Sequence, residues 1–257
     1  MEVAEHNAEI GGVPVRWLAA GDAPVLYLHG VPNSGAMWRP FVERGGGIAP
    51  DLPGFGRSGK GGDFDYSIEG YSGFLEAFLD HLGLRRPSLV MHDWGAVGLA
   101  FAQRFPQRIR SLVLVAVVPF LPGYRWHRVA RLWRRPGIGE LAMGVTTRWG
   151  MRRQLPAEVV DDVWPHFDHG TQRAILRLYR SAPEQVLAPA GERLGELTCR
   201  ALIAWGAHDP YLPDEFARRY ADALGGETEV EVLDGGHWPW LDRPELVERV
   251  TRFIAGS

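Results

Sequence analysis

The sequence predicts an α/β fold built on a mostly parallel sheet. Apolar runs of strand length alternate with amphipathic segments of helix length, which is the pattern of parallel strands joined by crossover helices. The runs cover residues 25–28, 88–91, 111–118, 201–205 and 229–233. Two earlier segments, 3–10 and 13–20, flank Gly11-Gly12 and predict an antiparallel hairpin that leads into the sheet. With 257 residues, 46% of them hydrophobic, the chain can bury a sizeable core as one domain.

Two helices of this alternation have recognisable ends. Apolar side chains recur at helical spacing over residues 68–82, with Ser67 in the N-cap position and Gly83 after the last turn. Near the C-terminus, Pro244 precedes a segment whose apolar residues recur on one face up to Ile254. Both patterns predict helices that pack one face against the sheet.

The alternation breaks over residues 119–190. This segment shows no convincing strand and is rich in tryptophan and arginine. We expect it to form a helical cap, inserted between two core segments, 1–118 and 191–257. Such a cap would cover the carboxyl ends of the strands, where open parallel sheets bind their ligands. A solvated helical bundle without a binding role is the alternative.

Charge and composition exclude several classes of partner. A net charge of -3 and a pI near 6.3 give no general positive field for a polyanion, so we expect no nucleic-acid partner. Cys199 is the single cysteine and cannot form an intramolecular disulfide. The N-terminus lacks an apolar segment, and no stretch approaches the roughly 20 apolar residues that a membrane span needs. We expect a soluble cytoplasmic protein, monomeric or homodimeric, with no membrane partner.

The most informative stretch of the sequence is Leu-Val-Met-His-Asp-Trp-Gly-Ala at residues 89–96. An apolar strand here runs directly into a helix of small residues, and a sharp turn of this kind holds its central residue, Asp93, exposed and strained. The alternative is that Asp93 only caps the following helix. The stretch resembles the nucleophile elbow of α/β-hydrolases, with aspartate where serine is more usual, as in epoxide hydrolases and haloalkane dehalogenases. Met91 stands where the elbow pattern usually has glycine.

Further motifs extend this resemblance over nearly the whole chain outside the cap. The sequence His-Gly-Val-Pro at 29–32 resembles the oxyanion-hole turn, and Asp-Leu-Pro-Gly-Phe-Gly-Arg-Ser at 51–58 resembles a scaffold turn of the same superfamily. The resemblance implies an oxyanion hole formed by the backbone N–H groups of Val31 and Trp94. It also implies a substrate pocket bordered by His29, Pro32 and Trp238.

Two polar clusters follow the last predicted strands. Asp209 comes after the run 201–205, and His237 comes after 229–233. A nucleophile, an acid and a histidine, each after a different strand, is the order found in α/β-hydrolases. We therefore expect Asp93, Asp209 and His237 to form a catalytic triad, with Asp234 as the alternative acid. No histidine pair has a spacing that argues for a metal site, and we expect neither a metal nor a cofactor.

The aspartate restricts the reaction. A carboxylate that attacked an ester would form a mixed anhydride, which is more activated than the substrate. At an sp3 carbon, Asp93 would instead form an alkyl ester, which water activated by His237 could hydrolyse. We therefore expect the partners to be a small apolar organic substrate and water.

Two leaving groups fit this scheme. An epoxide leaves as an alkoxide that needs a proton, and the resemblance to epoxide hydrolases implies cap tyrosines as donors, Tyr179 first and Tyr124 second. A halide needs only N–H donors such as the Trp94 indole, but Val31 stands where many dehalogenases have asparagine. We expect an epoxide hydrolase, with haloalkane dehalogenase as the alternative. Another hydrolase such as an esterase, or a non-catalytic binding protein on the same fold, is less favoured.

Overall fold

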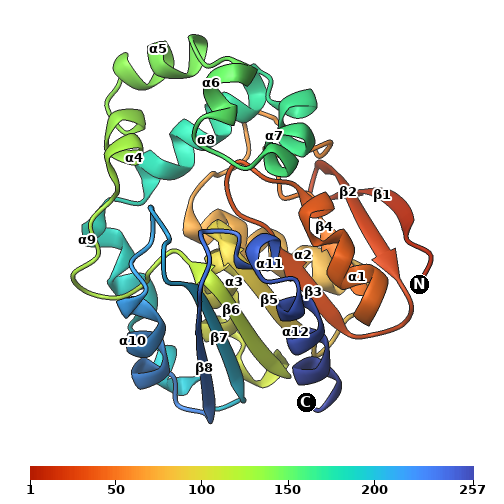
Figure 1. The fold of residues 1–257 in the computed structure, drawn as a ribbon. Helices are drawn as coiled ribbons and strands as arrows, with labels where there is room; N and C mark the ends of the chain where they lie inside the picture. The colour runs from red at the N-terminus through yellow and green to blue at the C-terminus, as the bar shows by residue number, and fades with distance from the viewer.

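A computed structural model describes residues 1–257 and confirms the predicted α/β class. Its single sheet has eight strands in the order β1-β2-β4-β3-β5-β6-β7-β8 (Figure 1). The pairs β1–β2 and β2–β4 are antiparallel, and all other pairs are parallel. The strands are β1 (Ala4–Ile10), β2 (Val13–Ala20), β3 (Val25–Leu28), β4 (Gly47–Pro50), β5 (Ser88–Asp93), β6 (Ser111–Val117), β7 (Ala201–Gly206) and β8 (Thr228–Leu233).

The predicted hairpin forms the edge of this sheet. Ile10 pairs with Val13 across a tight turn, and the register continues to Ala4 opposite Ala19. Gly11 and Gly12 both have positive φ, at 57° and 81°, which is the conformation that a two-residue hairpin turn requires. One strand, β4, is not among the predicted apolar runs.

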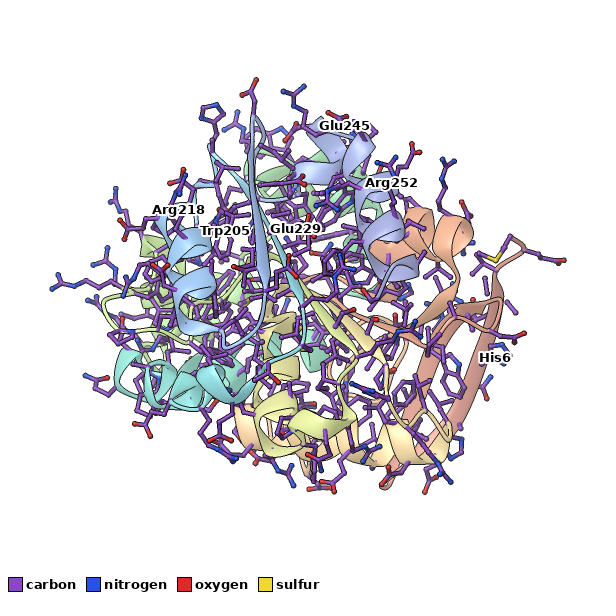
Figure 2. All side chains as sticks on the ribbon, turned by 90° about the horizontal axis from the view of Figure 1, so that it is seen from below. His6, Trp205, Arg218, Glu229, Glu245 and Arg252 are labelled. Atoms are coloured by element: carbon purple, nitrogen blue, oxygen red, sulfur yellow. The ribbon has the colours of Figure 1, made fainter.

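Helices cover both faces of the sheet and divide the core into two layers. The covering helices are α1 (Arg39–Gly45), α2 (Ile68–His81), α3 (Val97–Arg104), α10 (Glu215–Ala223), α11 (Pro239–Asp242) and α12 (Glu245–Ala255). Side chains alternate along β5, so that Leu89 and Met91 pack in the layer with α2, α3 and α10, whereas Val90 packs in the layer with α1 and α12. Trp205 is buried in the layer that contains α10, while Arg218 and Arg252 lie on the outer surface (Figure 2).

Between β6 and β7 the chain forms helices and no strand. These are α4 (Arg128–Trp133), α5 (Ile138–Gly144), α6 (Arg148–Arg152), α7 (Ala157–Val163), α8 (His169–Ser181) and α9 (Glu184–Leu187). Helices α4 to α8 lie above the carboxyl ends of the parallel strands (Figure 1). We call residues 119–190 the cap. No helix of the protein is both long enough and apolar enough to cross a membrane.

Candidate active site

Asp93 lies on a strained turn between β5 and α3. Its backbone has φ 48° and ψ -119°, a region that costs a residue other than glycine on the order of 1–3 kcal/mol. Close backbone packing enforces the turn: a Cβ on Gly30 would lie 2.3 Å from the Asp93 Cβ, and one on Gly95 would lie 2.2 Å from the Leu28 carbonyl oxygen. Met91 is accommodated because its side chain packs beside Gly98, which leaves room for it. The turn presents the Asp93 carboxylate at the carboxyl edge of the sheet.

Backbone N–H groups hold one side of this carboxylate. The Val31 N–H donates to Asp93 Oδ2 at 2.8 Å. Burial raises the pKa of Asp93, whereas the His237 charge and the N–H groups of Val31 and Trp94 oppose that rise. The two N–H groups that the sequence predicts as an oxyanion hole therefore both act on the same carboxylate. Oδ2 is the oxygen that the Val31 N–H holds, which leaves Oδ1 as the candidate for attack.

His237 and Asp209 form a buried pair. The His237 Nδ1–H donates to Asp209 Oδ2 at 2.7 Å, and the other carboxylate oxygen of Asp209 accepts from the N–H groups of Tyr211 and Leu212 at 2.8 and 3.0 Å. The alternative acid, Asp234, is exposed and pairs with His208 at 3.0 Å. The acid that contacts His237 is thus Asp209.

This pair determines the charge state of the imidazole. Burial by itself lowers the pKa of His237, but the Asp209 carboxylate and then the Asp93 carboxylate raise it above its usual value. Since Nδ1 is bound to Asp209, Nε2 is the nitrogen left for proton transfer. Asp93 and His237 line the same cavity, without a direct hydrogen bond between them.

The cavity has a volume of about 350 Å³ and lies between the sheet edge and the cap. Most of its lining is apolar, and Pro32 and Trp238 border it as the sequence predicts. His29 does not, which corrects our expectation. It is fully buried below the wall, where its Nε2 accepts from the Leu52 N–H at 2.9 Å and its Nδ1–H donates to the Gly30 carbonyl at 2.8 Å. His29 thus supports the oxyanion-hole turn and cannot contact a substrate.

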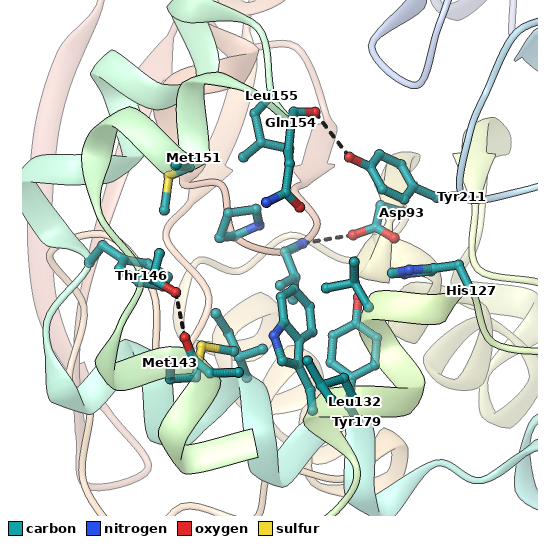
Figure 3. A pocket seen from close by; sticks show the side chains of 18 of the residues that line it. Asp93, His127, Leu132, Met143, Thr146, Met151, Gln154, Leu155, Tyr179 and Tyr211 are labelled. Atoms are coloured by element: carbon teal, nitrogen blue, oxygen red, sulfur yellow. Dashed lines mark hydrogen bonds between the residues drawn. The ribbon is translucent and has the colours of Figure 1, made fainter. Parts of the chain in front are cut away.

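The two predicted cap tyrosines occupy different places. Tyr179, on α8, lines the cavity, and its hydroxyl points toward Asp93 (Figure 3). Burial and the nearby Asp93 charge raise its pKa, so the hydroxyl stays protonated. Tyr124 is also buried, and its hydroxyl has no hydrogen-bond partner, but it does not line the cavity. It packs behind Trp126, with ring centroids 5.2 Å apart, and this position corrects the expectation that it reaches a substrate.

Indole donors near the nucleophile are limited. The buried Nε1–H of Trp94 has no hydrogen-bond partner. Trp126 lines the cavity and stacks on Trp94 at 5.4 Å, yet its own Nε1–H donates to the Ala182 carbonyl at 2.9 Å. Trp133 is a further cap tryptophan on the cavity wall.

Three polar residues on the cavity wall were not found from the sequence. His127 accepts from the Ala130 N–H with its Nδ1 at 3.4 Å, and burial lowers its pKa to about 4, so it faces the cavity as a neutral ring. The Tyr211 hydroxyl donates to the Gln154 carbonyl at 3.1 Å and joins the core to the cap (Figure 3). No periodicity marks these residues, although Tyr211 follows Asp209 so closely that proximity could have indicated it.

Other polar groups near the site have structural roles. The buried His92 donates from Nε2 to the His237 carbonyl at 2.8 Å and so supports the loop that carries the catalytic candidate. No group of three or more His, Cys, Asp or Glu side chains is arranged to hold a metal ion. The cavity therefore offers a carboxylate, an imidazole paired with a second carboxylate, backbone N–H donors and a tyrosine hydroxyl as its reactive groups.

Known proteins share this architecture. A family model described as "Alpha/beta hydrolase family" matches residues 25–250. The chain is 30% identical to a haloalkane dehalogenase of Bradyrhizobium diazoefficiens over all of this chain and 96% of that protein. It is similar to the crystal structure of haloalkane dehalogenase DbeA from Bradyrhizobium elkani, with 29% identity, a TM-score of 0.84 and coverage of 99% and 98% of the two chains. Epoxide Hydrolase A from Mycobacterium thermoresistibile, 23% identical, shares the fold with a TM-score of 0.83 over 99% of each chain.

These matches and the Asp93 elbow define the class of protein. The chain belongs to the α/β-hydrolase family, in the branch whose nucleophile is an aspartate. It is a hydrolase, and the proteins to which it is similar include haloalkane dehalogenases.

Proposed function

We propose that this hydrolase is an epoxide hydrolase, which converts an apolar epoxide into a vicinal diol. The observation that carries the proposal is the Tyr179 hydroxyl, which projects from the cap into the cavity toward the Asp93 carboxylate (Figure 3). An acid on one side and a nucleophile on the other are what opening an epoxide ring requires.

In the first step, Asp93 Oδ1 attacks a ring carbon, a C–O bond of the ring breaks, and the oxygen takes the proton of the Tyr179 hydroxyl. The Asp93 charge raises the pKa of Tyr179 before the reaction. That charge disappears as the ester forms, so the hydroxyl becomes a better acid at the moment when the alkoxide develops. Tyr179 regains its proton from water, and the product of this step is a hydroxyalkyl ester of Asp93.

In the second step, His237 removes a proton from water, and the resulting hydroxide attacks the ester carbonyl carbon of Asp93. The oxyanion forms on Oδ2, the oxygen that already accepts from the Val31 N–H at 2.8 Å. Asp209 stabilises the imidazolium through its 2.7 Å hydrogen bond. Collapse of the oxyanion releases the diol, whose departing oxygen takes the proton from His237. Asp93 is left as a carboxylic acid and loses its proton to the hydroxide that formed when water reprotonated Tyr179, which restores the resting enzyme.

Haloalkane dehalogenase is the second candidate, favoured by the partnerless Nε1–H of Trp94 and by the relatives of that name. A halide is stabilised best by two donors. Val31 supplies no side-chain donor, and the Trp126 indole is already bound to the Ala182 carbonyl. Trp133 would have to serve as the second donor, whereas the epoxide reaction uses a hydroxyl that is already positioned.

The test measures diol from a terminal epoxide and halide from a bromoalkane with the same enzyme. We expect diol formation, and we expect Tyr179→Phe to slow alkylation by the epoxide by about 100-fold to 10,000-fold, the usual contribution of a general acid. Tyr211→Phe is the matched control, because it removes a cavity hydroxyl that is bound to Gln154. Halide release that is insensitive to Tyr179→Phe but lost in Trp94→Phe and Trp133→Phe would establish the dehalogenase instead.

A further inference from the structure

The cap carries an unusual concentration of exposed apolar side chains. Of the eight large hydrophobic residues that are exposed in the chain, five lie on α4 to α6 or directly after them. We call these five the cap patch: Leu132, Ile138, Leu141, Val145 and Trp149. The last three are the most exposed of the five, at 68%, 66% and 65%. Helices α5 and α6 form the end of the molecule farthest from the sheet (Figure 1), so this surface projects outward.

The cap patch adjoins the cavity. Leu132 and Val145 belong to the patch and also line the cavity (Figure 3 labels Leu132). Val145 is 66% exposed, so the cavity wall extends to the protein surface here. A rigid protein partner that covered the patch would therefore close the cavity. A fluid apolar surface would leave it open and could deliver apolar molecules into it.

Exposed arginines accompany these apolar side chains. Arg131 and Arg135 flank Leu132 on either side in the chain, are exposed and have no acidic partner. The Arg153 guanidinium lies over the Trp149 ring, 3.6 Å from its centroid, and also has no acidic partner. Two acids of the cap are already engaged: Glu140 pairs with Arg180, and Asp161 is shared by Arg148 and Arg152. Apolar side chains accompanied by free arginines suit a surface that is apolar below and negatively charged at its boundary.

We propose that the cap patch docks onto an anionic phospholipid surface, with the cavity opening facing the lipid. Apolar substrate then enters from the membrane rather than from water. The absence of a spanning segment led us to expect no membrane partner, but docking of a cap surface inserts only a few side chains and needs no span. The inference concerns binding and is independent of which reaction the enzyme catalyses.

The test is co-sedimentation of the protein with vesicles in the absence of substrate. We expect binding to vesicles of phosphatidylcholine mixed with phosphatidylglycerol, weaker binding to phosphatidylcholine alone, and release by high salt. Leu141→Glu with Trp149→Glu should lower the affinity at least tenfold, since it places charges where apolar side chains must insert. Arg131→Gln should lower it about fivefold, the effect of one arginine near an anionic surface.

The matched control is Val232→Glu with Leu241→Glu, which changes two exposed apolar residues on the sheet and α11. These control substitutions should leave vesicle binding unchanged. Leu141→Glu with Trp149→Glu should leave turnover of a soluble substrate unchanged, because neither Leu141 nor Trp149 lines the cavity. Equal binding to both lipid compositions would overturn the proposal. So would an equal loss of vesicle affinity in the cap double variant and in the control double variant. So would analytical ultracentrifugation that finds a dimer dissociated by Leu141→Glu with Trp149→Glu, together with no vesicle binding.

Discussion

The carboxyl edge of the sheet and the cap hold their functional groups in different ways. At the sheet edge, backbone N–H groups fix the side chains: Asp93 accepts from Val31, and Asp209 accepts from Tyr211 and Leu212. In the cap, aromatic packing orients the Tyr179 ring, which lies edge-on to Trp94 and Trp133 at 5.4 and 5.2 Å. Backbone hydrogen bonds tolerate little change, whereas packed aromatic walls can be rebuilt residue by residue. Under the proposed function, we therefore expect the sheet edge to set how the substrate is attacked and the cap to set which substrate is admitted.

The largest effect should come from removing the nucleophile at the sheet edge. Asp93→Ala should lower turnover at least about 10,000-fold, because no other group can form the covalent ester. Single turnover of the unaltered enzyme in isotopically labelled water should place solvent oxygen in the Asp93 carboxylate, detected by mass spectrometry of its peptide. Label that reaches the product while the peptide remains unlabelled would show that water attacks the substrate directly.

Substitution of the base should separate the two chemical steps. His237→Gln should retain alkylation and slow dealkylation by about 100-fold to 10,000-fold, because the glutamine amide cannot accept the proton of water. Intact-protein mass spectrometry should then detect the alkyl-enzyme. If no adduct accumulates with any substrate that the unaltered enzyme accepts, the covalent scheme is wrong.

The acid should contribute less than the base that it orients. Asp209→Asn removes the charge that stabilises the imidazolium, and we expect turnover to fall by about 100-fold or more, mainly in dealkylation. Asp234→Asn is the matched control, because Asp234 pairs with the exposed His208 and does not contact His237. A comparable loss of turnover in Asp209→Asn and Asp234→Asn would contradict the assignment of Asp209 as the acid that orients His237.

A pH titration should show how much the Asp93 carboxylate, as distinct from the Asp209 carboxylate, raises the pKa of His237. In the resting enzyme both Asp209 and Asp93 raise the pKa of His237, but the ester removes the Asp93 charge. Dealkylation needs neutral His237, so its rate should decrease as the pH falls through the pKa of the alkyl-enzyme. That pKa should lie below the value that NMR titration gives for His237 in the resting enzyme. An equal or higher value would mean that Asp93 does not act on the imidazole.

The same contrast between regions explains what the sequence could predict. Strand and helix periodicity predicted the sheet, but it did not predict β4, because residues 45–47 are all glycine and only Ile48 and Ala49 follow before a proline. The residues at strand ends, Asp93, Asp209 and His237, could be inferred because the topology of parallel strands brings such ends to one edge.

In the cap, the resemblance to epoxide hydrolases indicated Tyr179, which does line the cavity, but it allowed little more. Whether a side chain reaches the cavity there depends on how several short helices pack, which no local pattern encodes. His127 and Gln154 line the cavity without any sequence signal, and Tyr124 packs behind the wall although its residue type suggested a donor. His29 was misplaced for a related reason: the motif located its backbone correctly but could not show that its ring turns inward to the Leu52 N–H.

The smallest expected effect concerns the attachment of the cap to the core. Lys60, the only lysine, donates to Asp168 and to the His166 carbonyl in the cap, at 2.8 Å each. Because the Asp168 side chain is 59% exposed, solvent screens this pair, and Lys60→Met should lower the free energy of unfolding by at most about 1 kcal/mol. Arg148→Met, which removes one of two arginines bound to Asp161 within the cap, should have a smaller effect. Urea denaturation measures the free energy of unfolding of both variants. A larger loss of stability in Arg148→Met would show that ion pairs within the cap, rather than those between the cap and the core, hold the cap in place.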